Sequence, residues 1–181
     1  MDAVGDMILQ ETCIDYDLSF IHNIEWFNYK DPLKDIMTHQ LKELHAPYGG
    51  MPSSYTDENT IIYQKFLSKS EIDYEVLSHQ TNIDIYTVSI IKQKPGNCIP
   101  LHTDKFYKLR QIKPKGNAVR ANIFIEDWAD GHILQFGNEL KWNWKKNTGW
   151  IFNEYVSHLS GNCGMQDKYT LQLSGFLKND Y

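Results

Sequence analysis

After Asn82 the chain adopts a pattern that few folds can accommodate. Short runs rich in β-branched and aromatic residues follow one another, and turn-forming pairs such as Pro95-Gly96 and Gly137-Asn138 separate them. The pattern predicts strands over residues 83–91, 119–126, 132–136, 139–144, 149–153, 155–158 and 168–176. No helical pattern lies between these runs, which indicates an antiparallel sandwich or barrel.

The part of the chain before Asn82 has a different character. A first strand is expected over residues 7–13. Asp31 and Pro32 then resemble an N-cap followed by proline at the first helical position. Apolar residues recur at helical spacing after them, so we expect a helix over residues 32–45.

Two further N-terminal segments complete this picture. Residues 46–60 contain prolines, glycines and serines and are expected to form a loop, which we consider as a lid over a site. Residues 58–77 allow a short helix with Ile62 and Phe66 facing the core. We therefore expect one domain over residues 1–181, mainly β with an N-terminal helical part (α+β): helical support over about residues 1–80 and a β core over about residues 82–177.

Charge and cysteine usage limit the partners and the compartment. The net charge of −5 argues against a nucleic-acid partner, and we read the one basic cluster, after Asp104, as a solvated loop. The three cysteines form no CxxC pair, which argues against a disulfide framework or a zinc knuckle. No apolar run approaches the ~20 residues that span a bilayer. We expect no membrane partner and a reducing cytoplasm, the host cytoplasm if the protein is viral.

His102 and Asp104 form a candidate metal site. They follow the turn at Pro95-Gly96, and on a strand residues two apart point to the same face. An imidazole and a carboxylate would then lie side by side, as in many transition-metal sites. A third ligand should be a histidine on a later strand, for which His132 and His158 are the candidates.

A strand after His158 offers a place for an anion. Over residues 168–176 polar and apolar side chains alternate, and Lys168 and Thr170 share the polar face. If that face points into a barrel, an ammonium group and a hydroxyl two residues apart can hold a carboxylate. The alternative is an ordinary sheet whose polar face meets water. Arg120 and Asn122 are likewise two apart on one predicted strand.

Taken together, these positions resemble the Fe(II)- and 2-oxoglutarate-dependent oxygenases. The likeness consists of His102-x-Asp104, a distal histidine at His158, and a basic residue followed by a hydroxyl residue at Lys168 and Thr170. It covers about half of the chain. The fold of that family is the double-stranded β-helix (a cupin-like jelly roll), in agreement with the predicted strands. The small size is also similar to oxygenases of unassigned substrate in bacteriophage genomes.

The resemblance implies a mechanism and a division of roles. His102, Asp104 and His158 would ligate Fe(II), and 2-oxoglutarate and O2 would be co-substrates. Lys168 and Thr170 would hold the far carboxylate of 2-oxoglutarate. Most members have arginine where this chain has Lys168, whereas the prolyl-hydroxylase-like branch has lysine.

Further contacts are expected around that site. Arg120 is a second candidate for the 2-oxoglutarate anchor, and Asn122 is expected to touch the co-substrate or the substrate. Gln93 stands where the prolyl-hydroxylase-like branch often has a tyrosine. The substrate is expected to be a small molecule or a peptidyl side chain, contacted by Tyr107 and by residues 46–60.

Two other readings remain open at this stage. A jelly-roll protein that binds ligands or has a structural role without redox activity would explain the strands alone. A cupin-like metalloenzyme would use the metal without 2-oxoglutarate and would not need Lys168. A hydrolytic zinc enzyme is disfavoured, because the chain has no His-Glu-x-x-His motif.

Overall fold

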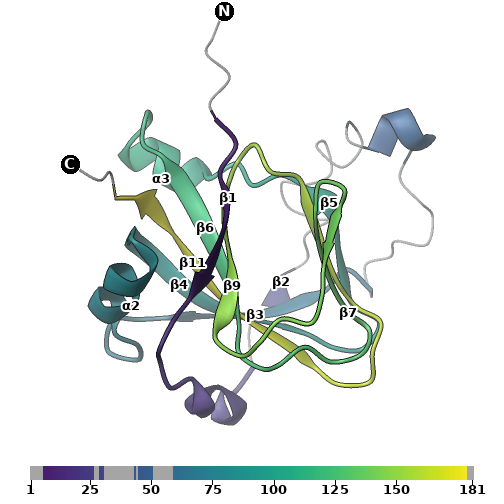
Figure 1. Ribbon diagram of the computed structural model, residues 1–181, viewed down its shortest axis with the longest axis horizontal. Helices are drawn as coiled ribbons and strands as arrows, with labels where there is room; N and C mark the ends of the chain where they lie inside the picture. The colour runs from purple at the N-terminus through teal and green to yellow at the C-terminus, as the bar shows by residue number, and fades with distance from the viewer. Residues whose placement is uncertain (1–5, 27–28, 31–42, 44, 51–58, 179–181) are drawn as a thin grey trace, which may run out of the picture.

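Two antiparallel sheets face each other in the computed structural model, which describes residues 6–26, 29–30, 43, 45–50 and 59–178 (Figure 1). The larger sheet has the strand order β1-β9-β6-β11-β4-β3-β2 and the smaller one β5-β10-β7-β8. The larger sheet comprises β1 (Leu9–Cys13), β2 (Tyr29–Lys30), β3 (Ile62–Leu67), β4 (Ile83–Gln93), β6 (Ala118–Phe124), β9 (Thr148–Asn153) and β11 (Lys168–Leu177). The smaller sheet comprises β5 (Cys98–His102), β7 (His132–Phe136), β8 (Glu139–Lys141) and β10 (His158–Asn162).

From β4 onward the chain alternates between the two sheets. β4, β6, β9 and β11 lie in the larger sheet, while β5, the β7–β8 hairpin and β10 lie in the smaller one. Each crossing adds a strand to the opposite layer, which is the winding of a double-stranded β-helix. The predicted jelly roll is therefore confirmed.

The largest apolar cluster lies on one face of the larger sheet. On β11, Leu171 and Leu173 point into this cluster, while Thr170 and Gln172 line a cavity on the opposite face. Helix α2 (Tyr74–Thr81) contributes Leu77 to the cluster. Residues 14–26, which include the 3-10 helix η1 (Ser19–Asn23), cover it as well. This apolar layer fixes the larger sheet, so that its opposite face can be polar.

A second cluster is aromatic and joins the two sheets. It is formed by Phe124, Leu134, Phe136, Trp144, Trp150, Phe152 and Val156. The rings of Phe124 and Trp144 stack at 3.8 Å between centroids. Five of these residues come from β6 and β9 of the larger sheet and from β7 of the smaller one, while Trp144 and Val156 lie between strands, so packing closes the barrel at this end. The cavity lies next to this aromatic cluster, because His158 lines the cavity and its ring lies 4.5 Å from that of Phe152 between centroids.

Several sequence expectations are met and others are wrong. The strand β7 has the predicted bounds, but residues 155–158 mostly form a turn, and β10 begins only at His158. The strand that carries His102, β5, was expected without stated bounds, and it contains Pro100, which cannot donate a ladder hydrogen bond. In the structure β5 is the edge strand of its sheet, where proline is tolerated.

The N-terminal part and the basic segment also differ from expectation. Ile62 and Phe66 lie on strand β3 rather than on a helix, which begins only at Tyr74 with α2. Phe66 is 60% exposed, because it points away from the apolar layer. Within the described residues the first 80 positions supply three strands to the larger sheet, so this part is less helical than expected. The helix expected over residues 32–45 lies almost wholly outside the described residues. Of the basic cluster after Asp104, Lys108 and Arg110 lie on helix α3 (Tyr107–Ile112) rather than in a loop, whereas Lys105, Lys113 and Lys115 lie outside helices and strands.

The helices of the described part are short. Besides α2, α3 and η1 they include the 3-10 helix η2 (Ala46–Tyr48). Among the described residues no helix has both the length and the apolar character needed to cross a bilayer.

Candidate metal centre

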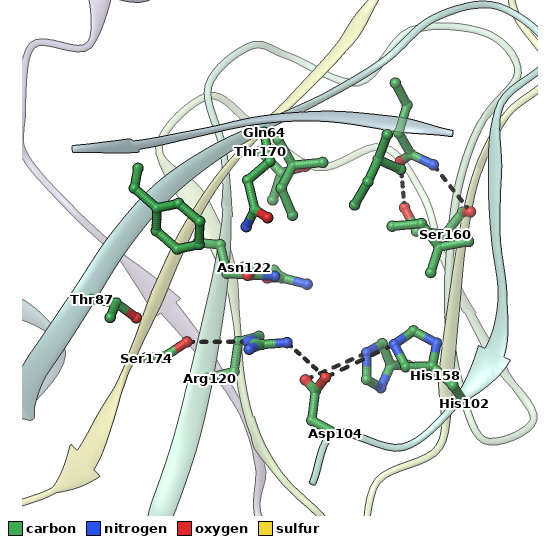
Figure 2. A pocket seen from close by; sticks show the side chains of 16 residues that line it. Gln64, Thr87, His102, Asp104, Arg120, Asn122, His158, Ser160, Thr170 and Ser174 are labelled. Carbon is green, nitrogen blue, oxygen red and sulfur yellow. Dashed lines mark hydrogen bonds and ion pairs between the residues drawn. The ribbon is translucent and has the colours of Figure 1, made fainter. Parts of the chain in front are cut away.

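Two buried histidines lie side by side on neighbouring strands of the smaller sheet. His102 is the last residue of β5 and His158 the first of β10, and the antiparallel register pairs them directly. Their ring centroids are 4.2 Å apart (Figure 2). Cross-strand partners on one face of a sheet are close neighbours, so the pairing of β5 with β10 by itself brings together two residues that are distant in sequence.

Asp104 completes the cluster from outside the strand. The sequence reading placed it on the same strand as His102, but β5 ends at His102 and Asp104 follows in irregular chain. Its carboxylate nevertheless reaches the histidines: Oδ1 lies 3.9 Å from Nε2 of His102, and Oδ2 lies 3.8 Å from Nε2 of His158. One donor atom of each residue lies within 4.8 Å of the others, and within the described residues no other such triad occurs.

Backbone carbonyls select the tautomer of both rings. Nδ1 of His102 lies 2.7 Å from the carbonyl oxygen of Pro100, and Nδ1 of His158 lies 3.1 Å from that of Val156. A carbonyl oxygen can only accept, so each Nδ1 carries a proton, and Nε2, on the side of Asp104, is the ring nitrogen that can bind a metal. The same arrangement orients histidine ligands in metal sites.

Burial keeps His158 neutral. Its pKa falls to about 3, first because the ring is removed from water and then because of the neighbouring His102, while Asp104 acts in the opposite direction. A neutral imidazole is the form that ligates a metal. Two imidazoles and one carboxylate fit the donor set of a mononuclear iron(II) site. The described residues can therefore hold such an ion.

His132, the other candidate for the third ligand, lies elsewhere. Its Nε2 is 3.2 Å from the carbonyl oxygen of Gln166, and its ring stacks near Trp144 with centroids 6.4 Å apart. Burial is the main cause that lowers its pKa. It shares no donor cluster with His102 and Asp104, so of the two candidates the structure brings only His158 to them.

A cavity of about 170 Å³ extends from the metal ligands between the two sheets. Arg120, Asn122 and Thr170 line it from the larger sheet, and Ser160 lines it from the smaller one (Figure 2). The remaining lining residues are Ile62, Gln64, Phe66, Thr87, Ile91, Gln93, Ile99, Gln172 and Ser174, together with His102, Asp104 and His158. The polar face of β11 thus points inward rather than into water.

Arg120 contacts the metal site directly. Its Nη1 donates to Oδ1 of Asp104 at 2.6 Å, and its Nε donates to Oγ of Ser174 at 3.2 Å (Figure 2). Asn122, two residues along β6, accepts a hydrogen bond from Gln172 at 3.2 Å. Both side chains face the cavity, as their spacing predicts. A role of either toward 2-oxoglutarate stays a prediction.

Lys168 lies behind the cavity wall and is not one of the residues that line it. Its Nζ donates to the carbonyl oxygen of Ile133 at 2.5 Å and to Oγ of Ser160 at 2.8 Å, with the carbonyl oxygen of Gly161 at 3.4 Å. The side chain is 1% exposed, and burial lowers its pKa to about 7. Lys168 is therefore connected to the cavity by its hydrogen bond to Ser160, which lines the cavity.

Ser160 is a cavity residue that sequence reasoning missed, and it pairs with Gln93, the position where the prolyl-hydroxylase-like branch often has a tyrosine. Oγ of Ser160 donates to Oε1 of Gln93 at 2.7 Å, and Nε2 of Gln93 donates to the carbonyl oxygen of Ser160 at 3.2 Å. Ser160 follows His158 by two residues on β10 and so shares its face. That spacing would have identified Ser160 if β10 had been placed correctly.

The expected substrate contacts are only partly covered by the structure. Tyr107 begins helix α3, is largely exposed, and is not one of the described residues that line the cavity. Most of the loop over residues 46–60 lies outside the described residues. Both contacts stay predictions.

Comparison with known proteins adds a likeness of fold. No protein-family model and no curated protein matches the chain. Among solved structures, the non-heme alpha-ketoglutarate-dependent carbocyclase SnoK from nogalamycin biosynthesis has a TM-score of 0.54 at 7% identity, covering 93% of this chain and 79% of that one. The viral collagen prolyl hydroxylase of Paramecium Bursaria Chlorella virus-1 has a TM-score of 0.47 at 17% identity, covering 84% and 96%. The Cnp3 cupin domain of Schizosaccharomyces pombe has a TM-score of 0.39 at 11% identity, covering 64% of each chain.

At such identities a structural likeness establishes architecture and not activity. The similarity to SnoK agrees with the winding of the two sheets, and it extends over nearly the whole chain. The chain therefore has a double-stranded β-helix fold with a His-Asp-His cluster that can bind a metal ion.

Proposed function

We propose that this protein is an Fe(II)- and 2-oxoglutarate-dependent oxygenase that hydroxylates a small-molecule or peptidyl substrate. The observation that carries the proposal is the convergence of His102, Asp104 and His158 at one wall of a polar cavity inside the barrel. Each imidazole has its Nδ1 held by a backbone carbonyl, so both rings are oriented before a metal arrives.

The donor set supports iron over zinc. Two imidazoles and a carboxylate on one side of an ion leave several positions for small ligands, whereas tetrahedral zinc sites keep at most one position open. Bound iron would supply the redox chemistry that couples decarboxylation of 2-oxoglutarate, with O2, to oxidation of a C–H bond. The residues of this chain would bind the iron, orient the co-substrate and the substrate, and exclude water from the site.

The cavity supports a small diacid as co-substrate. Its volume of about 170 Å³ is below the roughly 300–1,000 Å³ of pockets for drug-sized ligands. Thr170 and Asn122 offer hydrogen-bond donors along its walls. Lys168 lies one hydrogen bond behind Ser160, so a carboxylate that reaches Ser160 would gain the ammonium charge as a close neighbour.

Assignment to the prolyl-hydroxylase-like branch belongs to the same proposal and rests on lysine at position 168. Arg120 is the other candidate anchor for 2-oxoglutarate. Substitution of Lys168 and of Arg120 in turn shows which of the two side chains sets the affinity for 2-oxoglutarate. A cytoplasmic location and a bacteriophage origin stay predictions.

One observation favours a second candidate, a cupin-like metalloenzyme that does not use 2-oxoglutarate. The three acceptors around Nζ of Lys168 match the three N–H groups of an ammonium, so a carboxylate must replace one of them. On this reading Lys168 is structural, and its removal would leave turnover intact.

The proposal is tested by turnover of 2-oxoglutarate in the presence of iron. Purified protein loaded anaerobically with Fe(II) and then given O2 should convert 2-oxoglutarate to succinate, quantified by NMR. His102→Ala and His158→Ala should each reduce the rate by more than the roughly 10–100-fold that loss of an outer metal-site partner costs. His132→Gln is the matched control, because His132 is also buried but lies outside the cluster.

The outcomes separate the candidates. Succinate formation that survives His102→Ala would refute the assignment of the metal site. A protein that binds iron but forms no succinate, and whose iron affinity is unchanged in Lys168→Met, would favour the cupin-like enzyme.

A further inference from the structure

We infer that Arg120 is a positioning residue, which fixes the carboxylate of Asp104 for metal binding, and that the ring of Phe106 holds Arg120 in place. The inference rests on the metal site of the proposed function and goes beyond the ligand set. It concerns how a ligand outside any strand acquires a defined orientation.

Asp104 differs from the two histidines in how it is held. The pairing of β5 with β10 fixes the backbone of His102 and His158, but Asp104 lies beyond the end of β5. The guanidinium of Arg120 engages its Oδ1 at 2.6 Å, while Oδ2 remains on the side of His158 at 3.8 Å from Nε2. One oxygen is thus held by a cation, and the other is directed toward the histidines.

Arg120 is itself anchored at its other end. It lies on β6 opposite Ser174 of β11, and its Nε donates to Oγ of Ser174 at 3.2 Å. Its side chain is only 23% exposed. The guanidinium therefore forms a bridge from the larger sheet to the chain that continues from the smaller one, and this bridge ends on the ligand (Figure 2).

Phe106 supports that bridge from the side. The central carbon of the Arg120 guanidinium lies 5.4 Å from the centroid of the Phe106 ring, within the range of a cation–π contact. The ring is buried and packs with Leu109, Ala118 and Phe176. The segment that carries Asp104 therefore folds back to contact the arginine that holds Asp104.

The backbone of Phe106 is in an unusual conformation. Its φ is +48°, a left-handed value that bulky residues rarely adopt and that persists only where the surrounding structure enforces it. Such conformations cluster at functional sites. Here the conformation places the Phe106 ring against Arg120, the residue that binds the metal ligand Asp104. This contact is a functional reason for the strained backbone.

An opposite reading is that Arg120 only replaces a missing cation. A guanidinium next to the ligands would then compete with the metal, and its removal would tighten metal binding. If Arg120 orients the carboxylate, its removal weakens metal binding, because the carboxylate must then be ordered at the expense of binding energy. The two readings predict opposite signs, so a metal titration decides between them.

The test is an anaerobic titration with Co(II), followed by its visible absorption, which reports affinity and ligand geometry without turnover. Arg120→Met should weaken Co(II) binding by about 10–100-fold and alter the absorption band. Arg120→Lys should recover only part of the affinity, because one ammonium cannot reproduce the two directed contacts of a guanidinium. Arg110→Met is the control, since Arg110 pairs with Glu154 and with the carbonyls of Pro114 and Gly116.

A double-mutant cycle tests the contribution of Phe106. Phe106→Leu should weaken Co(II) binding severalfold in the wild-type background and have little effect in the Arg120→Met background, because the ring acts through the arginine. Should Arg120→Met fail to fold, as judged by circular dichroism, Arg120→Lys and Phe106→Leu still test the inference.

Each result has one meaning. Unchanged or tighter Co(II) binding in the folded Arg120 variants would overturn the inference while leaving the metal site intact. Absence of Co(II) binding in the wild-type protein would instead refute the proposed function.

Discussion

The side chain of Lys168 crosses the interior of the barrel and ends among oxygen acceptors and aromatic rings. Its Nζ lies 5.5 Å from the ring centroid of Phe124 and 5.4 Å from that of Trp144. These rings and the carbonyls favour the ammonium form, whereas burial disfavours it and lowers the pKa to about 7. Close to neutral pH, a negative charge placed next to Lys168 therefore favours its protonated form.

This environment predicts a pH dependence of co-substrate affinity. Below pH 7 Lys168 is protonated and can attract a carboxylate; above pH 7 it is neutral, so binding must take up a proton. The Kd for 2-oxoglutarate, measured by calorimetry with Fe(II) under anaerobic conditions, should rise from pH 7 upward by at most about tenfold per pH unit.

Lys168→Met provides the control for this prediction. The variant should bind 2-oxoglutarate weakly and without the rise in Kd. Weak binding in Arg120→Met together with unchanged binding in Lys168→Met would instead identify Arg120 as the anchor. A wild-type Kd that is constant from pH 6.5 to about 9 would contradict a role for the Lys168 ammonium.

At the scale of elements, the cavity depends on the close approach of β6 and β9. Gly149 of β9 lies against β6 so tightly that a Cβ atom there would be 1.9 Å from the carbonyl oxygen of Asn122. β6 also carries Arg120, so the spacing of these strands places both cavity-facing side chains. A glycine at this position is required by the contact with backbone and not by its φ angle.

Gly149→Ala should therefore destabilise the protein by about 1–3 kcal/mol or more, because backbone must move to admit the methyl group. Gly161→Ala is the matched control: a Cβ at Gly161 of β10 would have its nearest neighbour at 3.9 Å. Its effect should stay within about 0.5 kcal/mol. Urea unfolding midpoints measure both changes, and equal midpoints for the two variants would contradict the packing argument.

At the scale of the whole molecule, a bound metal would connect segments that are far apart in sequence. His102 and Asp104 flank the end of β5, His158 begins β10, and Arg120 links Asp104 to the larger sheet. An ion held by the native cluster favours the folded state, since the unfolded chain does not bring these ligands together.

A metal ion at a free concentration 100 times its Kd should stabilise the fold by about 2.7 kcal/mol, which corresponds to a rise in Tm of roughly 5–10 °C. Calorimetric melts with and without Mn(II), a redox-stable substitute for Fe(II), measure this shift. His158→Ala should abolish it and His132→Gln should retain it. A shift of the same size in His158→Ala would show that the stabilising ion binds elsewhere.

The local pattern of residues determined the core of the fold. Alternation over β11 and the turn residues around β7 were sufficient to place these strands, because side-chain periodicity and turn chemistry are short-range properties. Residue types and spacing also identified His102 and Asp104, and the resemblance to the oxygenase family selected His158 over His132; the structure brings His102, Asp104 and His158 together.

Only the tertiary structure decided what surrounds these residues. Proline is compatible with β5 because β5 is an edge strand, which depends on the neighbours of the strand and not on its residues. Likewise, Arg120 meets Asp104, and Lys168 is enclosed behind Ser160, through contacts between segments distant in sequence. Sequence periodicity specifies which way a side chain points from its own strand, but the group it meets there is set by the packing of one sheet against the other.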